Sequence, residues 1–188
     1  EYALYVYNGK TLEVTLLSKG NKCLDLENVN GSLCLNELGK GIGFMSETGI
    51  DWLKGDLKNT EIRGIEKSTD GGYYLYGREA VYFYRNGSIS RLGQVDAIAK
   101  NIISDVVISR GKRIICTEQS GAFVVGKNFE VIHHFSADAG TLPSNYIYAA
   151  AQNAQGDICF ATLNGISLVP LSSPVFNVDA SAGIAGAG

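Results

Sequence analysis

Two adjacent histidines, His133 and His134, carry the only imidazole groups in the sequence, so histidine chemistry of any kind depends on them. They fall in the segment 128–135, which is typical of a β-strand, and neighbouring residues of a strand point to opposite faces of the sheet. The two rings therefore cannot bind one metal ion together. No GxSxG turn is present to support Ser-His-Asp catalysis. We expect both histidines on an exposed outer strand.

The four cysteines contain no CxxC pair, which makes a structural zinc site improbable: Cys23, Cys34, Cys116 and Cys159. Buried, unpaired thiols that pack as small hydrophobic groups are the favoured interpretation. A two-residue turn at Asn30-Gly31 would place Glu27 opposite Cys34 and leave Cys23 about four residues away. A disulfide is therefore disfavoured, although a different turn would allow one.

Two glycine-containing motifs resemble ligand loops but lack the features that such loops need. The segment GKGIGF has glycines at 39, 41 and 43, without the spacing or the βαβ context of a dinucleotide site. The segment DLENVNG places Val29 at a position where a calcium loop needs an oxygen ligand. We predict no metal site, no cofactor and no enzymatic activity.

The segment 73–87, YYLYGREAVYFYRNG, is the densest aromatic stretch of the chain. Its tyrosines alternate along two predicted strands that flank Arg78: Tyr74, Tyr76, Tyr82 and Tyr84. Aromatic rings with hydroxyl tips beside an arginine can form a surface that stacks on sugars or docks a protein. Packing between neighbouring sheets explains the same pattern and is the interpretation that we favour. The candidate binding residues of this segment are Tyr74, Tyr76 and Arg78.

The elements that position these residues follow from an internal repeat of 38 to 44 residues. Its anchors are followed by short apolar runs: Ala3, Gly41, Ala80, Gly121 and Gly165. Gly49 fits nearly as well as Gly41, but Gly41 makes the spacing more uniform. We therefore place the segment 49–55 on the next strand outward.

Each period is predicted to contain four short antiparallel strands, which in one unit are 101–109, 112–117, 120–126 and 128–135. Dipeptides that favour tight hairpin turns separate the strands: Asn8-Gly9, Asn30-Gly31, Gly71-Gly72, Asn86-Gly87 and Asn164-Gly165. Four strands in about 40 residues are typical of a β-propeller blade. The predicted fold class is therefore all-β, a β-propeller; a sandwich or a barrel is the alternative.

The repeat also predicts how the chain is divided. Residues 1–172 are expected to form about three complete and two partial blades, because residue 3 aligns with the third strand of a blade. The Ala- and Gly-rich segment 173–188 is typical of a tail or linker. Since a propeller ring has typically four to eight closed blades, we expect an incomplete segment of a larger propeller, with the rest of its own chain as a partner.

The segment 142–166 resembles the two-component-regulator propeller repeat. The family pattern has a Leu-Pro/Ser-Ser-Asn start, a Gly-Asn/Asp-Ile/Leu-Trp core, a Gly/Ala-Thr pair and a Gly-Leu/Ile end. The matching residues here are Leu142, Pro143, Ser144, Asn145, Gly156, Asp157, Ile158, Phe160, Ala161, Thr162, Gly165 and Ile166. Cys159 stands where the family usually has tryptophan. The likeness is good over 141–169, moderate over 101–125 and weak elsewhere.

The resemblance implies a non-enzymatic module of the cell envelope, in the periplasm or at the cell surface. One family setting is the PorZ-like propeller of type IX secretion and cargo attachment, which we take as the first hypothesis. The alternative is the periplasmic ligand-sensing domain of a hybrid two-component histidine kinase. The partners implied are other envelope proteins, a surface glycan or lipopolysaccharide.

By the same resemblance, the loop 141–146 lies near the mouth of the propeller channel, where propellers commonly bind their partners. Its candidate binding residues are Ser144, Asn145 and Tyr146. Asn101 stands one period earlier and is the fourth candidate. Turn chemistry alone also explains the serine and the asparagine.

Composition excludes several partners. The net charge is −3 and the isoelectric point is about 5.4, without a cluster of lysines and arginines, so nucleic acid is not expected to bind. No stretch approaches the ~20 apolar residues of a membrane-spanning helix. The chain starts with Glu1 and shows no signal peptide, so its compartment cannot be predicted from its start.

Overall fold

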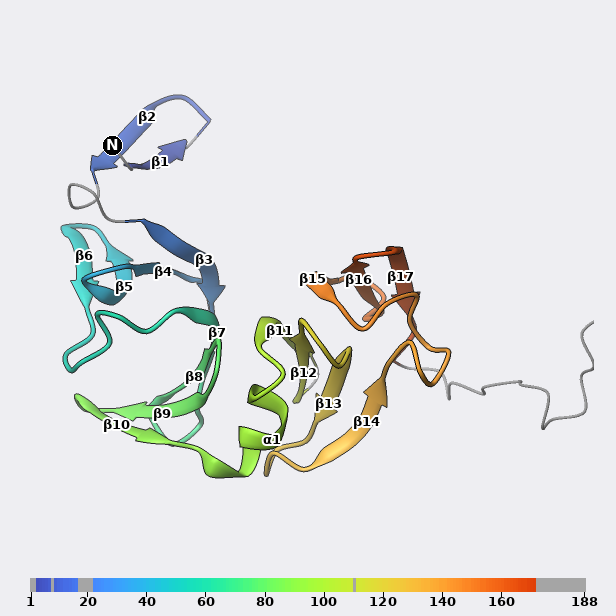
Figure 1. The fold of residues 1–188 in the computed structure, drawn as a ribbon. Helices are drawn as coiled ribbons and strands as arrows, with labels where there is room; N and C mark the ends of the chain where they lie inside the picture. Colours follow the sequence, from blue (N-terminus) through green and yellow to red (C-terminus); the bar gives the residue numbers. More distant parts are fainter. Residues whose placement is uncertain (1–2, 8, 17–21, 110, 172–188) are drawn as a thin grey trace, which may run out of the picture. The chain divides into compact units, whose positions relative to one another are not determined.

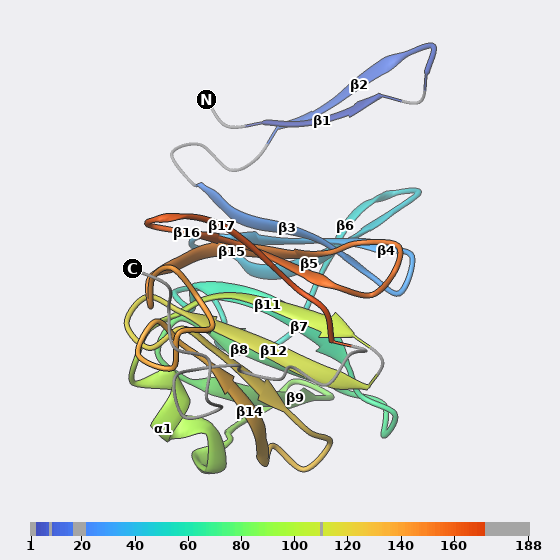
Figure 2. The same cartoon turned by 90° about the vertical axis from the view of Figure 1, so that its right-hand side faces the viewer.

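The computed structural model describes residues 3–7, 9–16, 22–109 and 111–171, which form five antiparallel sheets in chain order (Figure 1). The first sheet is a hairpin of β1 (Ala3–Tyr7) and β2 (Leu12–Leu16), also seen in Figure 2. The second sheet contains β3 (Cys23–Val29), β4 (Ser32–Glu37), β5 (Gly41–Ser46) and β6 (Gly49–Trp52). The third contains β7 (Ile62–Lys67), β8 (Tyr73–Gly77), β9 (Val81–Arg85) and β10 (Ser88–Arg91).

The remaining sheets follow two short helical turns, η1 (Gly93–Val95) and α1 (Asp96–Ala99). The fourth sheet contains β11 (Ile103–Ser109), β12 (Lys112–Thr117), β13 (Ala122–Val125) and β14 (Val131–Phe135). The fifth contains β15 (Ile147–Gln152), β16 (Ile158–Thr162) and β17 (Gly165–Val169). Repeated antiparallel sheets, four-stranded where complete, are the blades of a β-propeller, which confirms the predicted fold class.

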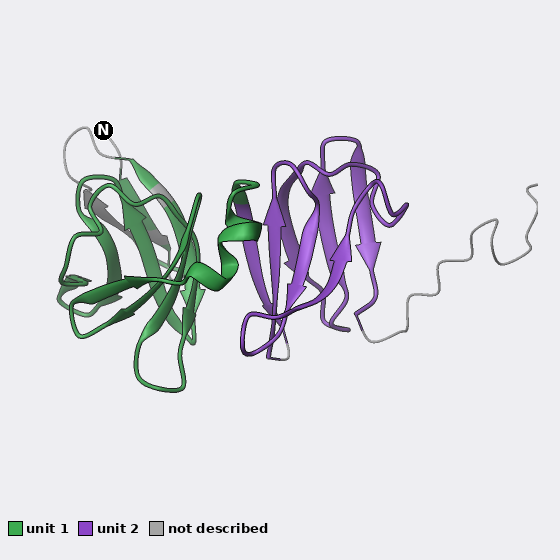
Figure 3. Ribbon diagram, turned by 60° about the horizontal axis from the view of Figure 1, so that its bottom comes forward, with its two compact units in different colours: residues 1–103 green, residues 104–188 purple. Residues whose placement is uncertain are grey.

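The chain forms two compact units, residues 1–103 and 104–188, which are coloured separately in Figure 3. Each unit is described by itself. The predicted tail, 173–188, and Asn8 of the predicted Asn8-Gly9 turn lie outside the described residues.

Most strands lie where the repeat predicts them, with instructive differences at their ends. Gly41 begins a third strand and Gly49 begins an outer strand, which confirms the chosen anchor. The strand predicted to start at residue 101 starts at Ile103, because Asn101 and Ile102 continue the helical turn. Their amide groups donate to the carbonyl oxygens of Ile98 and Ala99 at 3.0 Å.

The hairpin turns show which dipeptides act as expected. Asn30-Gly31 and Asn86-Gly87 form two-residue loops with positive φ, from 50° to 85°, that pair Val29 with Ser32 and Arg85 with Ser88. The turn predicted at Asn164-Gly165 lies one residue earlier, because Gly165 already pairs with Thr162. Gly71-Gly72 belongs to a longer turn, in which the Ser68 amide donates to the Gly72 carbonyl oxygen.

Within each unit, two consecutive blades pack face to face; we call the face of a blade on the side of the following blade in the chain its forward face and the opposite face its rear face. In unit 1, the forward face of β3–β6 packs against the rear face of β7–β10. Register places Glu27, Cys34 and Phe44 in one row of this forward face. The buried forward-face residues are Val29, Cys34 and Ile42, and the rear-face residues are Ile65, Tyr73, Leu75, Tyr82 and Tyr84.

Unit 2 repeats this arrangement between β11–β14 and β15–β17. The forward face of β11–β14 presents Val107, Ile114, Cys116, Ala122 and Val124. The rear face of β15–β17 presents Ala150, Ile158, Phe160 and Val169. In both units apolar side chains from the two faces meet and become buried, so the burial of apolar surface between blades stabilises each unit.

A carboxylate also links the inner strands of neighbouring blades. The inner strands β7 and β15 are edge strands of their sheets, so alternate amide groups along them have no partner within the sheet. Glu27 of β3 accepts from the Ile65 amide at 2.8 Å, and Asp105 of β11 accepts from the Ala150 amide at 2.7 Å. The inner edge strand therefore receives the same kind of acceptor in both units.

The buried thiols should make the folded protein less stable at alkaline pH. Burial, with the carboxylates of Glu27 and Asp25, raises the pKa of Cys34 from 9.0 to about 12, and burial raises the pKa of Cys116 well above 9.0. Above about pH 9 the unfolded chain loses these protons and the folded chain keeps them. The unfolded state then binds fewer protons, so the free energy of unfolding falls by up to about 1.4 kcal/mol per pH unit for each thiol.

Urea unfolding at pH 8, 9 and 10 checks this expectation. The loss of stability between pH 9 and pH 10 should shrink in Cys34→Ala and shrink again when Cys116→Ala is added. If the free energy of unfolding falls equally with pH in the unmodified chain and in the double variant, these thiols do not cause the loss of stability.

Candidate functional site

A pocket of about 290 Å³ lies at the end of β7–β10 where β7 begins, β8 ends and β9 begins. Two segments form it: the connection that leads from β6 into β7 and the turn between β8 and β9. The lining residues are Asn59, Thr60, Glu61, Gly77, Arg78, Glu79 and Tyr82. The whole pocket belongs to unit 1.

Backbone hydrogen bonds hold the two segments together. The Arg78 amide donates to the Glu61 carbonyl oxygen at 3.0 Å, and the Gly77 amide donates to the Ala80 carbonyl oxygen at 2.8 Å. The turn is tight at Gly77, where an added Cβ atom would lie 2.9 Å from the Ala80 carbonyl oxygen. Strand pairing on either side therefore presents the side chains of Arg78 and Glu79 at the end of the blade.

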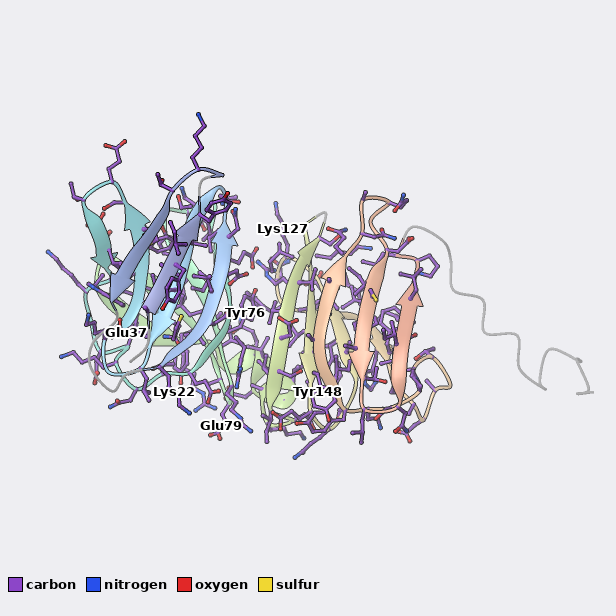
Figure 4. All side chains as sticks on the ribbon, turned by 90° about the horizontal axis from the view of Figure 1, so that it is seen from above. Lys22, Glu37, Tyr76, Glu79, Lys127 and Tyr148 are labelled. Carbon is purple, nitrogen blue, oxygen red and sulfur yellow. The ribbon has the colours of Figure 1, made fainter. Side chains whose placement is uncertain are left out.

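The charges of the pocket are mixed. The Arg78 guanidinium lies 3.9 Å from a Glu61 carboxylate oxygen, and the same carboxylate contacts Arg63. Glu79 is exposed at the turn; Figure 4 labels it together with the buried Tyr76. Hydroxyl groups from Thr60 and Tyr82 complete a set that contains both hydrogen-bond donors and acceptors beside an aromatic ring. This combination suits a ligand rich in hydroxyl groups better than an apolar one.

The structure divides the predicted tyrosine cluster between two faces of the blade. Register pairs Tyr74 with Phe83 on the forward face and Leu75 with Tyr82 on the rear face. Tyr74 packs against Phe83 with ring centroids 5.2 Å apart, and Tyr76 is fully buried with its hydroxyl group donating to Glu66 at 2.7 Å. The four tyrosines therefore do not share one face of the blade, because the two strands pair with their tyrosines offset by one residue.

Of the three candidates from this segment, the structure places Arg78 in the pocket. Sequence reasoning missed Asn59, Thr60, Glu61 and Glu79, which precede or join strands and belong to no motif. Tyr82 was noticed as an aromatic residue but not as part of a site. Their common signal is position, since all lie at strand ends that antiparallel pairing brings to one edge of the sheet.

The remaining candidates hold loops in place. The Asn145 side chain accepts from the Ala137 amide at 2.7 Å and donates to Asp138 at 3.1 Å, and the Ser144 hydroxyl accepts from the Tyr146 amide at 3.1 Å. The Asn101 side chain donates to the carbonyl oxygens of Ala97 and Ile98 at the end of α1. Asn101 lies in unit 1 and the residues 144–146 lie in unit 2.

The histidines lie on β14, the outer strand of its sheet, and both are exposed, as predicted. His134 stacks on Phe123 with ring centroids 4.2 Å apart. Among the described residues, no group of three or more His, Cys, Asp or Glu side chains could hold a metal ion. Within the same residues, no helix is long and apolar enough to cross a membrane.

Solved structures similar to this chain are propeller domains. The extracellular domain of the putative hybrid two-component system BT4673 from B. thetaiotaomicron matches with a TM-score of 0.67 and 16% identity, over 92% of this chain and 25% of that one. The corresponding domain of BT3049 from the same organism matches with a TM-score of 0.56 and 16% identity, over 81% of this chain and 21% of that one. This chain therefore spans about a quarter or less of these neighbours.

An enzyme shares the fold as well. A catalytically inactive virginiamycin B lyase from Staphylococcus aureus matches with a TM-score of 0.59 and 13% identity, over 90% of this chain and 63% of that one. No protein-family model matches the chain, and no curated protein matches its sequence. At these identities the neighbours establish the β-propeller fold, and they agree with the resemblance to two-component-regulator propellers that the motifs indicated.

Proposed function

We propose that this chain is a ligand-recognition module that acts outside the cytoplasm, as the sensing part of a hybrid two-component regulator, and that its ligand site is the pocket at Arg78. The pocket carries the proposal, because it concentrates polar side chains of both charges at one open end of a blade. The likeness to the extracellular domains of BT4673 and BT3049 supports this role more than cargo attachment in type IX secretion.

The ligand that suits this pocket is a glycan fragment. Sugar hydroxyl groups both donate and accept hydrogen bonds, so they suit an arginine beside carboxylates and an amide. The ring of Tyr82 offers an apolar face to the C–H groups of a sugar. Chemistry on the ligand is not part of the proposal.

A panel of envelope glycans, with lipopolysaccharide included, tests this function by thermal shift and calorimetry. At least one glycan should raise the unfolding temperature, because a ligand that binds only the folded state stabilises it. Replacing Arg78 with alanine should weaken binding about ten-fold or more, which is about 1.4 kcal/mol.

Arg85→Ala is the matched control, because Arg85 is an exposed arginine of β9 outside the pocket. It should leave the affinity unchanged. Equal affinity for the unmodified chain and Arg78→Ala would exclude the pocket as the site. A complete absence of stabilisation by glycans would exclude the proposed ligand class.

A further inference from the structure

The backbone of Ile102 has a conformation that β-branched residues seldom adopt. Its φ angle is 61°, in the left-handed region, where the Cβ atom of any residue other than glycine is crowded. Left-handed residues commonly end helical turns, but glycine usually occupies such positions. Among the described residues, Ile102 is the only β-branched one with a positive φ angle. This conformation costs free energy, so contacts on both sides of Ile102 must hold it in place.

Hydrogen bonds to α1 hold the residue from one side. The Ile102 amide donates to the Ala99 carbonyl oxygen at 3.0 Å. The Asn101 side chain donates to the carbonyl oxygens of Ala97 and Ile98 at 3.1 and 3.3 Å. These bonds fix the place where the helical turn ends, so the change from helix to strand falls on Ile102.

A backbone hydrogen bond holds the other side, and its acceptor belongs to the pocket. Ile103 is fully buried, and its amide donates to the Arg78 carbonyl oxygen at 2.8 Å. The Arg78 amide donates in turn to the Glu61 carbonyl oxygen at 3.0 Å, and both Arg78 and Glu61 line the pocket. The backbone of Arg78 is therefore bonded both to the other pocket segment and to the start of β11.

Ile102 and Ile103 also lie where the chain leaves unit 1. Unit 1 ends at Ile103, and β11 continues from Ile103 into unit 2. A rotation of the backbone at Ile102 changes the direction of the strand that follows it, because φ and ψ are the soft dihedral angles of the chain. The pocket turn is therefore hydrogen-bonded next to a strained residue at the exit from unit 1.

We propose that Ile102 is a strained hinge that couples the pocket turn at Arg78 to the start of β11. In the first state, which the structure shows, the Ile103 amide is bonded to Arg78 and Ile102 is left-handed. In the second state this bond is broken and Ile102 relaxes to an ordinary backbone conformation. The strain favours the second state and the hydrogen bond favours the first. A ligand that holds the pocket turn stabilises the first state, a consequence that rests on the proposed function, whereas the hinge does not.

Hydrogen exchange at the Ile103 amide, followed by NMR without any ligand, tests the hinge. Under conditions where exchange reports the opening equilibrium, Ile102→Gly should slow it about five-fold, because glycine adopts the left-handed conformation without strain. Ile102→Ala is the matched control, since it removes the side chain but keeps the crowded Cβ atom. It should slow exchange at Ile103 by at most about two-fold. Unchanged or faster exchange in Ile102→Gly would exclude the hinge.

A substitution in the pocket turn tests the coupling. In Gly77→Ala the added Cβ atom would lie 2.9 Å from the Ala80 carbonyl oxygen, so the turn must shift. Exchange at the Ile103 amide should become at least about five-fold faster, and adding Ile102→Gly should reverse most of this change. Gly87→Ala is the control, because it strains the β9–β10 hairpin of the same blade outside the pocket. Equal effects of Gly77→Ala and Gly87→Ala at Ile103 would exclude the coupling.

These measurements need no ligand, so the hinge and the proposed function are tested separately. The final measurement adds the panel glycan that gives the largest rise in unfolding temperature. Exchange at the Ile103 amide of the unmodified chain should then slow further, because the bound turn keeps its hydrogen bond to Ile103. A glycan that binds at Arg78 without slowing this exchange would overturn the link between the ligand and the hinge.

Discussion

Replacing Phe160 with alanine is expected to lower the free energy of unfolding of residues 104–188 by about 3–5 kcal/mol, the usual cost of removing a fully buried phenylalanine. Phe160 is completely buried on the rear face of β15–β17, and its ring centroid lies 6.0 Å from that of Phe135. The loss would open a cavity in the middle of the contact between two blades, where backbone pairing on both sides limits relaxation.

Cys159→Ala provides the matched control, because Cys159 neighbours Phe160 in β16 but lies on the forward face and is partly exposed. Its cost should be below about 1 kcal/mol, as for most exposed positions. Hydrogen exchange measured peptide by peptide separates the units: Phe160→Ala should lower protection in 104–171. A similar loss in the free energy of unfolding for the two substitutions would contradict the assignment of Phe160 to the buried rear face and Cys159 to the forward face.

Replacing Asp105 with alanine is expected to destabilise the same unit by about 1.5–3 kcal/mol, the range for hydrogen bonds to charged groups. The Asp105 carboxylate accepts from the Ala150 amide at 2.7 Å and from the Val106 amide at 2.8 Å. Alanine leaves both donors without this acceptor. Hydrogen exchange at the Ala150 amide should accelerate. This acceleration directly measures the loss of the hydrogen bond between Asp105 and Ala150.

Asp105→Asn is the informative comparison, because its single carbonyl oxygen can keep one of the two hydrogen bonds. Its free energy of unfolding should lie between those of the unmodified chain and Asp105→Ala. Glu27→Ala tests the equivalent link in unit 1, where it should accelerate exchange at the Ile65 amide. Unchanged exchange at Ala150 in Asp105→Ala would show that the sheet holds this amide without the carboxylate.

Much of the fold could be predicted because its signals are local. Asn30-Gly31 and Asn86-Gly87 adopt positive φ within their own hairpins, and this geometry decides which residues pair across the turn. The start of β11 was predicted two residues too early, because a single helical turn before Ile103 is too short to show a helical period.

The candidate site was much less predictable. Arg78 was selected for the tyrosines around it, yet the structure places those tyrosines on two faces, and Arg78 shares its pocket with Tyr82 and with Glu61, whose carboxylate it approaches. Ser144, Asn145 and Asn101 were selected as binding residues, and their side chains also make hydrogen bonds within their own loops. Such residues are good turn formers, so sequence alone does not separate the two roles.

The sequence by itself determined the all-β blade repeat, the hairpins and the rows of alternating side chains, because turn chemistry and strand alternation act within a few residues. The tertiary structure alone decided which row each blade buries, since a shift of one residue in pairing moves a whole row to the other face. It also decided the pocket at Arg78 and the carboxylate links from Glu27 and Asp105. These features join residues that lie far apart in the chain, so only the packing of strands and blades brings them together.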